Sequence, residues 1–120
     1  MTISYNRLGS NGRLGNQMFQ YASLRGIANY NQYQWMIPPP DCNHRDNYGL
    51  FDTFEMKHCK PENLGFNDGM TITEKTHAFD DSMFYCTDGV NIDSYLQTED
   101  YFVHIADQIR EDFTFKKDYL

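Results

Sequence analysis

The chain has 120 residues, of which 40% are hydrophobic, and 10 Lys and Arg face 17 Asp and Glu for a net charge of -7. This length suits one small domain. The acidic balance argues against a nucleic-acid partner and against an acidic membrane surface, since both need basic side chains. No apolar run is long enough for a transmembrane segment, and the N-terminus does not read as a signal peptide.

The first third of the chain predicts a strand, a helix and a second strand. Residues 3–8 alternate apolar and polar side chains, which is typical of a strand. From Asn16 to about Tyr30 the apolar residues recur every three or four positions, which predicts a helix with one apolar face. Residues 34–37 predict the second strand, which must end at the prolines 38–40. The resulting βαβ unit indicates an α/β fold with a Rossmann-like beginning.

The remainder predicts shorter elements. Residues 41–69 are rich in Asn, Asp, Gly and Pro and predict short elements and loops, whereas residues 70–76 and 90–96 predict strands. A last helix is expected after Thr98, which can cap it. Its apolar face would consist of Phe102, Ile105, Ala106, Ile109 and Phe113.

A glycine-rich turn connects the first strand to the first helix. Gly9, Gly12 and Gly15 stand three residues apart, which matches neither the GxGxxG dinucleotide fingerprint nor a P-loop, so the spacing favours neither NAD nor ATP. Glycines at such positions can simply permit a tight turn. The helix that follows offers free backbone N–H groups, which can bind phosphate.

This turn and the helix carry a resemblance to a known family. The run Gly12-Arg13-Leu14-Gly15-Asn16-Gln17-Met18-Phe19-Gln20-Tyr21-Ala22 resembles the opening signature of the α-1,2-fucosyltransferases of glycosyltransferase family 11. Residues 95–102 and 109–115 resemble a second segment of the family. In the middle of the chain, residues 44–45 and 50–54 match the family loosely. The resemblance implies the Rossmann-like N-terminal domain of a GT-B-type glycosyltransferase. Its reaction would transfer fucose from GDP-fucose to a galactose-type glycan acceptor with inversion, without a metal or other cofactor.

The resemblance also implies site residues. Asn16 and Arg13 would be catalytic, and Gly12, Gly15, Asn16 and Gln17 would contact the nucleotide sugar. Each has a plainer interpretation. Asn is a favoured helix N-cap, a lone Arg usually lies in solvent, and Gln17 can hydrogen-bond a neighbouring loop instead of a ligand.

The same resemblance implies an incomplete enzyme. Family members carry a downstream His-x-Arg-Arg-Gly-Asp motif that holds the donor pyrophosphate, and this chain has no Arg-Arg pair. Residues 1–120 are therefore expected to form a single N-terminal domain, with the nucleotide-binding C-terminal half absent. Two alternatives stay open: a non-catalytic, truncated sugar-binding or interaction domain, and one half of a split enzyme completed by a partner chain. The expected setting is the bacterial or viral cytoplasm, including the inner membrane surface.

Two further sets of residues could form a site. Cys42, His44, His58 and Cys59 do not fit zinc-ligand spacing, so no metal site is predicted, and three cysteines without a CxxC pair indicate reduced thiols. Tyr95, Gln97 and Glu99 alternate, so a strand would project them together, either at an acceptor cleft or at an ordinary strand end.

Overall fold

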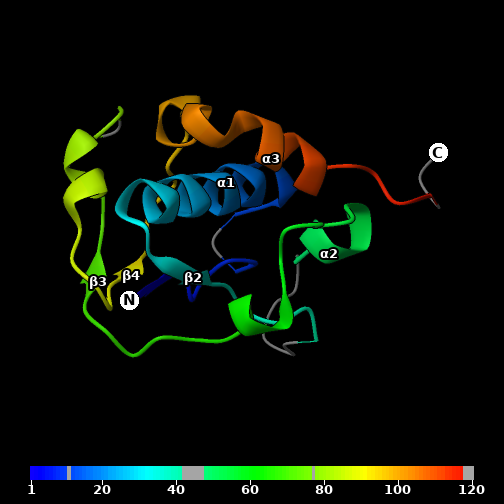
Figure 1. Ribbon diagram of the computed structural model, residues 1–120, viewed down its shortest axis with the longest axis horizontal. Coiled ribbons are helices and arrows are strands. Elements are labelled where there is room, and N and C mark those ends of the chain that lie inside the picture. Colours follow the sequence, from blue (N-terminus) through cyan, green and yellow to red (C-terminus); the bar gives the residue numbers. More distant parts are fainter. Residues whose placement is uncertain (11, 42–47, 77, 118–120) are drawn as a thin grey trace.

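A four-stranded parallel sheet lies beneath the helices in the computed structural model, which describes residues 1–10, 12–41, 48–76 and 78–117 (Figure 1). The strands are β1 (Thr2–Ser4), β2 (Gln34–Met36), β3 (Thr71–Ile72) and β4 (Asn91–Ile92), in the order β2-β1-β4-β3. The α-helices are α1 (Leu14–Asn31), α2 (Leu50–Thr53) and α3 (Ala106–Asp112). Short 3-10 helices are η1 (Pro61–Asn63), η2 (Asp81–Tyr85), η3 (Glu99–Tyr101) and η4 (Val103–Ile105).

The predicted βαβ unit is confirmed, and the fold is of the α/β class. Strand β1 pairs in parallel with β2 on one side, with Ile3 opposite Trp35, and with β4 on the other, with Ser4 opposite Asn91. The first strand is shorter than predicted, because the chain turns at once: the Leu8 amide donates to the Tyr5 carbonyl over 3.2 Å. Strands β3 and β4 are likewise shorter than their predicted ranges.

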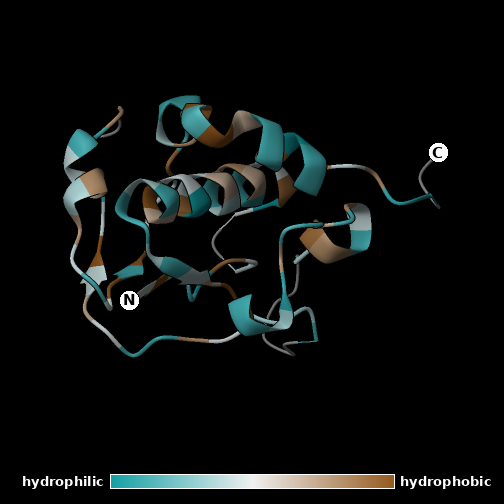
Figure 2. Cartoon of the chain, in the orientation of Figure 1, coloured by the Kyte–Doolittle hydropathy of each residue, from teal (hydrophilic) through white to brown (hydrophobic). Residues whose placement is uncertain are grey.

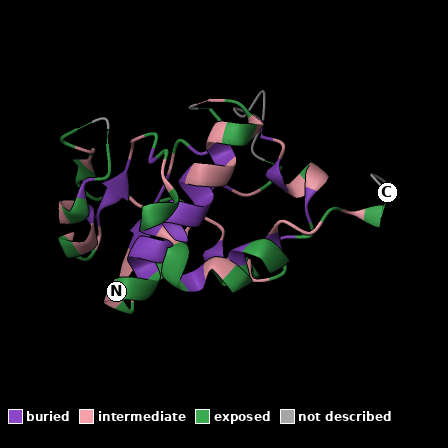
Figure 3. Cartoon of the chain, turned by 90° about the horizontal axis from the view of Figure 1, so that it is seen from above, coloured by how far each residue is buried: buried purple, intermediate pink, exposed green. Residues whose placement is uncertain are grey.

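Helix α1 lies between the sheet and the C-terminal helical segment (Figure 1), and much of its length is buried (Figure 3). It is therefore buried on more sides than the single apolar face that the sequence predicts. Figure 2 shows hydrophilic residues among the hydrophobic ones on this helix. The C-terminal segment comes very close to α1 at Gly26, where an added Cβ would lie 1.9 Å from the Tyr101 carbonyl oxygen. Only a residue without a side chain fits there.

A buried ion pair explains one of the polar residues on α1. The Arg25 guanidinium contacts the carboxylate of Asp112 at the end of α3, and Arg25 and Asp112 are 6% and 0% exposed. The Tyr21 hydroxyl donates to the same carboxylate over 2.5 Å. Burial, followed by the neighbouring Asp112 charge, raises the pKa of Tyr21. These contacts fasten the last helix to the first.

The predicted C-terminal helix is interrupted. Thr98 does act as a cap, because its hydroxyl accepts from the Asp100 amide over 3.3 Å, but the helix that it opens is η3. The regular helix α3 begins only at Ala106. Four of the five residues of the predicted apolar face do pack together against Ala22, namely Phe102, Ile105, Ile109 and Phe113.

The predicted loop region after the prolines contains α2 and η1, and Tyr48 anchors its beginning. The Tyr48 hydroxyl donates to the Pro38 carbonyl over 2.6 Å. Its ring lies under Gly9, where an added Cβ would come within 2.6 Å of a ring carbon. Gly9 also has a φ of 91°, which a residue with a side chain rarely adopts. The glycine turn after β1 is thus required by the packing of Tyr48.

Candidate functional site

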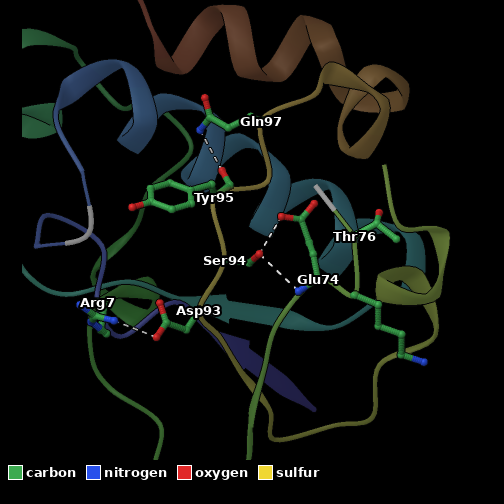
Figure 4. A pocket seen from close by; sticks show the side chains of 8 residues that line it. Arg7, Glu74, Thr76, Asp93, Ser94, Tyr95 and Gln97 are labelled. Atoms are coloured by element: carbon green, nitrogen blue, oxygen red, sulfur yellow. Dashed lines mark hydrogen bonds and ion pairs between the residues drawn. The ribbon is translucent and has the colours of Figure 1, made fainter. Parts of the chain in front are cut away.

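A cavity of about 520 Å³ opens at the carboxyl ends of three parallel strands. Arg7 follows β1, residues 74–76 follow β3, and residues 93–95 with Gln97 follow β4 (Figure 4). Strands β1 and β4 are neighbours, but the chain leaves β1 toward β2 and reaches β4 from β3 on the opposite side. In open α/β sheets ligands bind at such a change of direction, outside the carboxyl ends of the strands.

Glu74 holds one wall of this cavity in place. Its carboxylate accepts from the Ser94 hydroxyl over 2.6 Å, from the Leu96 amide over 3.0 Å and from the Tyr101 hydroxyl over 2.6 Å. Burial and the hydrogen bond to Glu74 raise the pKa of Tyr101, so this phenol remains a donor at neutral pH. The segments after β3 and β4 are thereby fixed to each other and to η3.

The opposite side of the cavity is more open. Arg7 and Asp93 form an ion pair of 3.0 Å, with 56% and 21% of their side chains exposed. Tyr95 is 53% exposed, and the Gln97 side-chain amide donates to the Tyr95 carbonyl over 2.9 Å. Figure 4 shows Ser94 and Glu74 between Tyr95 on one side and Thr76 on the other. The exposed Tyr95 ring points away from Ser94 and Glu74, toward the side on which Arg7 lies (Figure 4).

The predicted strand that would project Tyr95, Gln97 and Glu99 together does not form. Tyr95 and Gln97 line the cavity, but they follow β4 and do not continue it as a strand. Glu99 begins η3 and is not among the lining residues. Sequence reasoning missed Glu74, because only the pairing of β3 with β4 brings it next to Ser94.

The predicted donor site, at the N-terminus of α1, is open to solvent. The helix begins at Leu14, with exposed Arg13 in the cap position and without a capping side-chain hydrogen bond. Gly15 is exposed, and an added Cβ there would meet nothing within 4 Å. The first turn of an α-helix leaves backbone N–H groups without a helical partner. Anion-binding groups thus face an accessible surface.

The structure corrects the role of Asn16 as the N-cap. Asn16 is the third residue of α1, and its side chain lies against Gly12, where an added Cβ would be 2.6 Å from the Asn16 Nδ2 atom. Gln17 is fully buried. Its Nε2 atom donates to the Gly12 carbonyl over 3.2 Å, and its Oε1 atom accepts from the Gly49 amide over 3.3 Å. Of the two interpretations of Gln17, the bond to a neighbouring loop is the one observed.

The β1–α1 loop connects the cavity to the tip of α1. Arg7 lines the cavity and lies in this loop, where its carbonyl accepts from the Ser10 amide over 2.9 Å. The same loop ends at Arg13, in the cap position of α1. Arg13 and Asn16 are not among the residues that line the cavity.

Of the four residues considered as zinc ligands, His58 and Cys59 lie within the described ranges. His58 Nε2 lies 3.1 Å from a carboxylate oxygen of Glu111, and burial raises the pKa of Cys59 to about 12. Cys42 and His44 lie outside the described residues. Within the described ranges, no three His, Cys, Asp or Glu side chains gather as they would around a metal ion, and Cys59 and Cys86 are free thiols.

Comparison of the chain with known protein families, curated proteins and solved structures finds no match. No helix within the described ranges combines the length and the apolar character that spanning a membrane requires.

Proposed function

We propose that this chain is a fucosyltransferase domain of the GT-B type, which transfers fucose from GDP-fucose to a galactose-type glycan with inversion. The observation that carries the proposal is the solvent-open N-terminus of α1, inside the sequence block that resembles the family. Arg13 and Gly15 are exposed at this helix end. A polar cavity at the same edge of the sheet offers space for a second substrate.

The proposed chemistry uses charge stabilisation of the leaving group. An acceptor hydroxyl attacks C1 of fucose, the bond from C1 to the pyrophosphate oxygen breaks, and its electron pair leaves with GDP while the hydroxyl loses its proton. The helix N-terminus carries about half a positive charge. The Arg13 guanidinium can add two parallel hydrogen bonds to phosphate oxygens. The nucleotide itself would be held by a C-terminal half that carries the arginine motif of the family.

The test is a titration of the chain with GDP-fucose that is monitored by NMR of the backbone amides. We expect shifts at the amides of residues 14–16 and weaker binding in Arg13→Ala. Arg110→Ala is the matched control, because Arg110 is 75% exposed on α3 and far along the chain. Unshifted amides at the helix tip with millimolar GDP-fucose would contradict the proposal.

Asn16→Asp separates ligand binding from stability. A carboxylate in the first turn favours the helix dipole by about 0.3–1 kcal/mol, so the free energy of unfolding should stay equal or rise. The same charge repels a pyrophosphate, so GDP-fucose affinity should fall about tenfold or more, which corresponds to about 1.4 kcal/mol. Equal affinity of both proteins would remove Asn16 from the donor site.

The charge distribution favours a second candidate, a sugar-binding domain without catalysis. The chain has a net charge of -7, and the cavity is lined by equal numbers of basic and acidic side chains. Neither the negative net charge nor the balanced lining attracts a nucleoside diphosphate. Binding of a galactose-terminated glycan without any GDP-fucose binding would favour this candidate. Transfer activity that appears only with an added chain carrying the arginine motif would favour the split enzyme.

A further inference from the structure

We infer that the aromatic surface around η2, formed by Tyr30, Phe79, Phe84 and Tyr85, docks a basic peptide segment of a partner protein. Arginine or lysine side chains of that segment would lie over the exposed rings. This surface is separate from the proposed donor site, because Tyr30 stands near the C-terminal end of α1 and Arg13 at its N-terminal end. At 1.5 Å per residue, about 25 Å of helix separates the two.

The rings of the aromatic surface pack against one another and yet remain open to solvent. The Phe84 ring is central, with its centroid 4.8 Å from that of Tyr30 and 5.9 Å from that of Phe79. The Tyr85 ring meets the Tyr30 ring edge-on at 6.2 Å. Tyr30 and Tyr85 are 53% and 72% exposed. Exposed clusters of this kind mark interaction sites, and tyrosine is enriched at protein interfaces.

An apolar groove of about 400 Å³ continues from Tyr85 along the edge of the sheet. Met70 and Ile72 line it on the side of β3, which is the outermost strand at this end of the sheet. Met83 and Cys86 line it on the side of η2. An arginine or lysine side chain combines an apolar stem with a charged head. Its stem therefore fits such a groove while its head reaches the rings at the rim.

The charge of this part of the chain favours a cationic partner. Residues 76–109 contain seven Asp and Glu and no Lys or Arg, so this segment alone accounts for the net charge of -7. Its exposed Asp81 lies beside Tyr85: the hydrogen bond with Tyr30 raises the pKa of Tyr85, and the Asp81 charge raises it further. A guanidinium placed here gains both a cation–π contact and a carboxylate partner.

The C-terminal end of α1 adds to the same field. The carbonyl groups at this end of a helix carry about half a negative charge, which basic side chains often offset. The last turn of α1 includes Tyr30 and contains no basic residue. Lys75 lines the groove, but its charge is offset by the neighbouring Asp80. A cation over the Tyr30 ring would thus be attracted by the helix end, whereas an acidic partner would be repelled.

The experiment is an NMR titration of the whole chain, without nucleotide, with a synthetic peptide in which arginine alternates with serine. We expect shifts at the amides of residues 70–73 and 79–87, and binding that weakens as salt is added. Tyr85→Ala should weaken binding by about fivefold or more, through loss of a cation–π contact. The matched control is Tyr95→Ala, which removes another exposed tyrosine, outside this groove, and should leave the affinity unchanged.

A second pair of variants tests the charge. Asp81→Asn should weaken binding by about threefold, as expected for one surface ion pair. Glu55→Gln removes the same charge from an exposed position and should have no effect. Glu55 follows α2, which lies at the opposite end of the molecule from η2, the yellow-green helical turn in Figure 1. Thermal unfolding checks that all four variants remain folded.

The peptide itself supplies the last control. Citrulline has nearly the shape of arginine without its charge, so a peptide with citrulline at every arginine position should not bind. Equal affinity for the two peptides, unchanged affinity in Tyr85→Ala, or shifts confined to other residues would overturn the inference. Since no nucleotide is present, none of these results depends on the proposed donor site.

Discussion

Replacing Asp112 by Ala should destabilise the protein more than any surface change, because it removes the centre of a buried network. The carboxylate is fully buried and accepts from Arg25, from the Tyr21 hydroxyl over 2.5 Å and from the His58 amide over 2.6 Å. Without it, the Arg25 guanidinium, which is only 6% exposed, loses its carboxylate partner, and keeps the Gln108 side-chain oxygen at 2.7 Å and its position over the Tyr21 and Trp35 rings.

The magnitude follows from these contacts. Each hydrogen bond to a charged group contributes about 1.5–3 kcal/mol, and removing one partner of a buried ion pair costs about 3–5 kcal/mol in total once the site relaxes. We therefore expect Asp112→Ala to lower the free energy of unfolding by about 3–5 kcal/mol. Domains have a free energy of unfolding of only about 5–15 kcal/mol, so the variant should lose a large share of its stability.

Urea denaturation followed by circular dichroism measures the effect. Asp107→Ala is the control, because its ion pair with Arg110 is on the surface, with 97% of the Asp107 side chain exposed, and its loss should leave the urea midpoint unchanged. The double variant Arg25→Met with Asp112→Leu removes both charges and should recover much of the lost stability. A loss below about 1 kcal/mol in Asp112→Ala would refute the reasoning, since it is smaller than one charged hydrogen bond.

Two further predictions concern packing and pH. Gly26→Ala should lower the free energy of unfolding by about 1–3 kcal/mol, because its Cβ would collide with the Tyr101 carbonyl at 1.9 Å. Gly15→Ala, with open space around it, should instead raise it by up to about 1 kcal/mol, and equal urea midpoints for the two variants would contradict the contact at Tyr101. Burial raises the pKa of Cys59 from 9.0 to about 12. Between pH 9 and 12 the unfolded chain therefore loses a proton that the folded chain keeps, so the free energy of unfolding falls as the pH rises. Urea midpoints at pH 8 and 10 measure the fall, which should be smaller in Cys59→Ala; an equal fall would exclude this thiol as its cause.

The sequence was sufficient for the local part of the fold. The βαβ unit depends on nearby residues, and its helix begins only two positions before the predicted start. The error has a clear cause: Asn is a better N-cap than Arg, yet Arg13 occupies the cap position without any capping hydrogen bond. The strand after Met1 was overestimated, because alternation continues through residue 8 whereas the chain turns at Tyr5.

The cavity depends on long-range pairing, which a single sequence does not reveal. Thr71 lies opposite Asn91 and Ile72 opposite Ile92, and the same offset places Glu74 beside Ser94. Nothing around residue 74 indicates that it will meet residue 94. The alternation of Tyr95, Gln97 and Glu99 was a signal of the site, but only the first two of these residues line the cavity, and no strand continues through them.

The position of β1 in the middle of the sheet determines when the protein can fold during synthesis. The Thr2 carbonyl accepts from the Gly89 amide over 2.8 Å, and the Ser4 amide donates to the Val90 carbonyl over 3.0 Å. During synthesis, β1 therefore waits for β4, one of its two neighbours in the sheet, until the chain around residue 90 has emerged. Such distant pairing slows folding and leaves apolar surface uncovered on the nascent chain. Chaperone demand should accordingly be greatest before residue 90 becomes available.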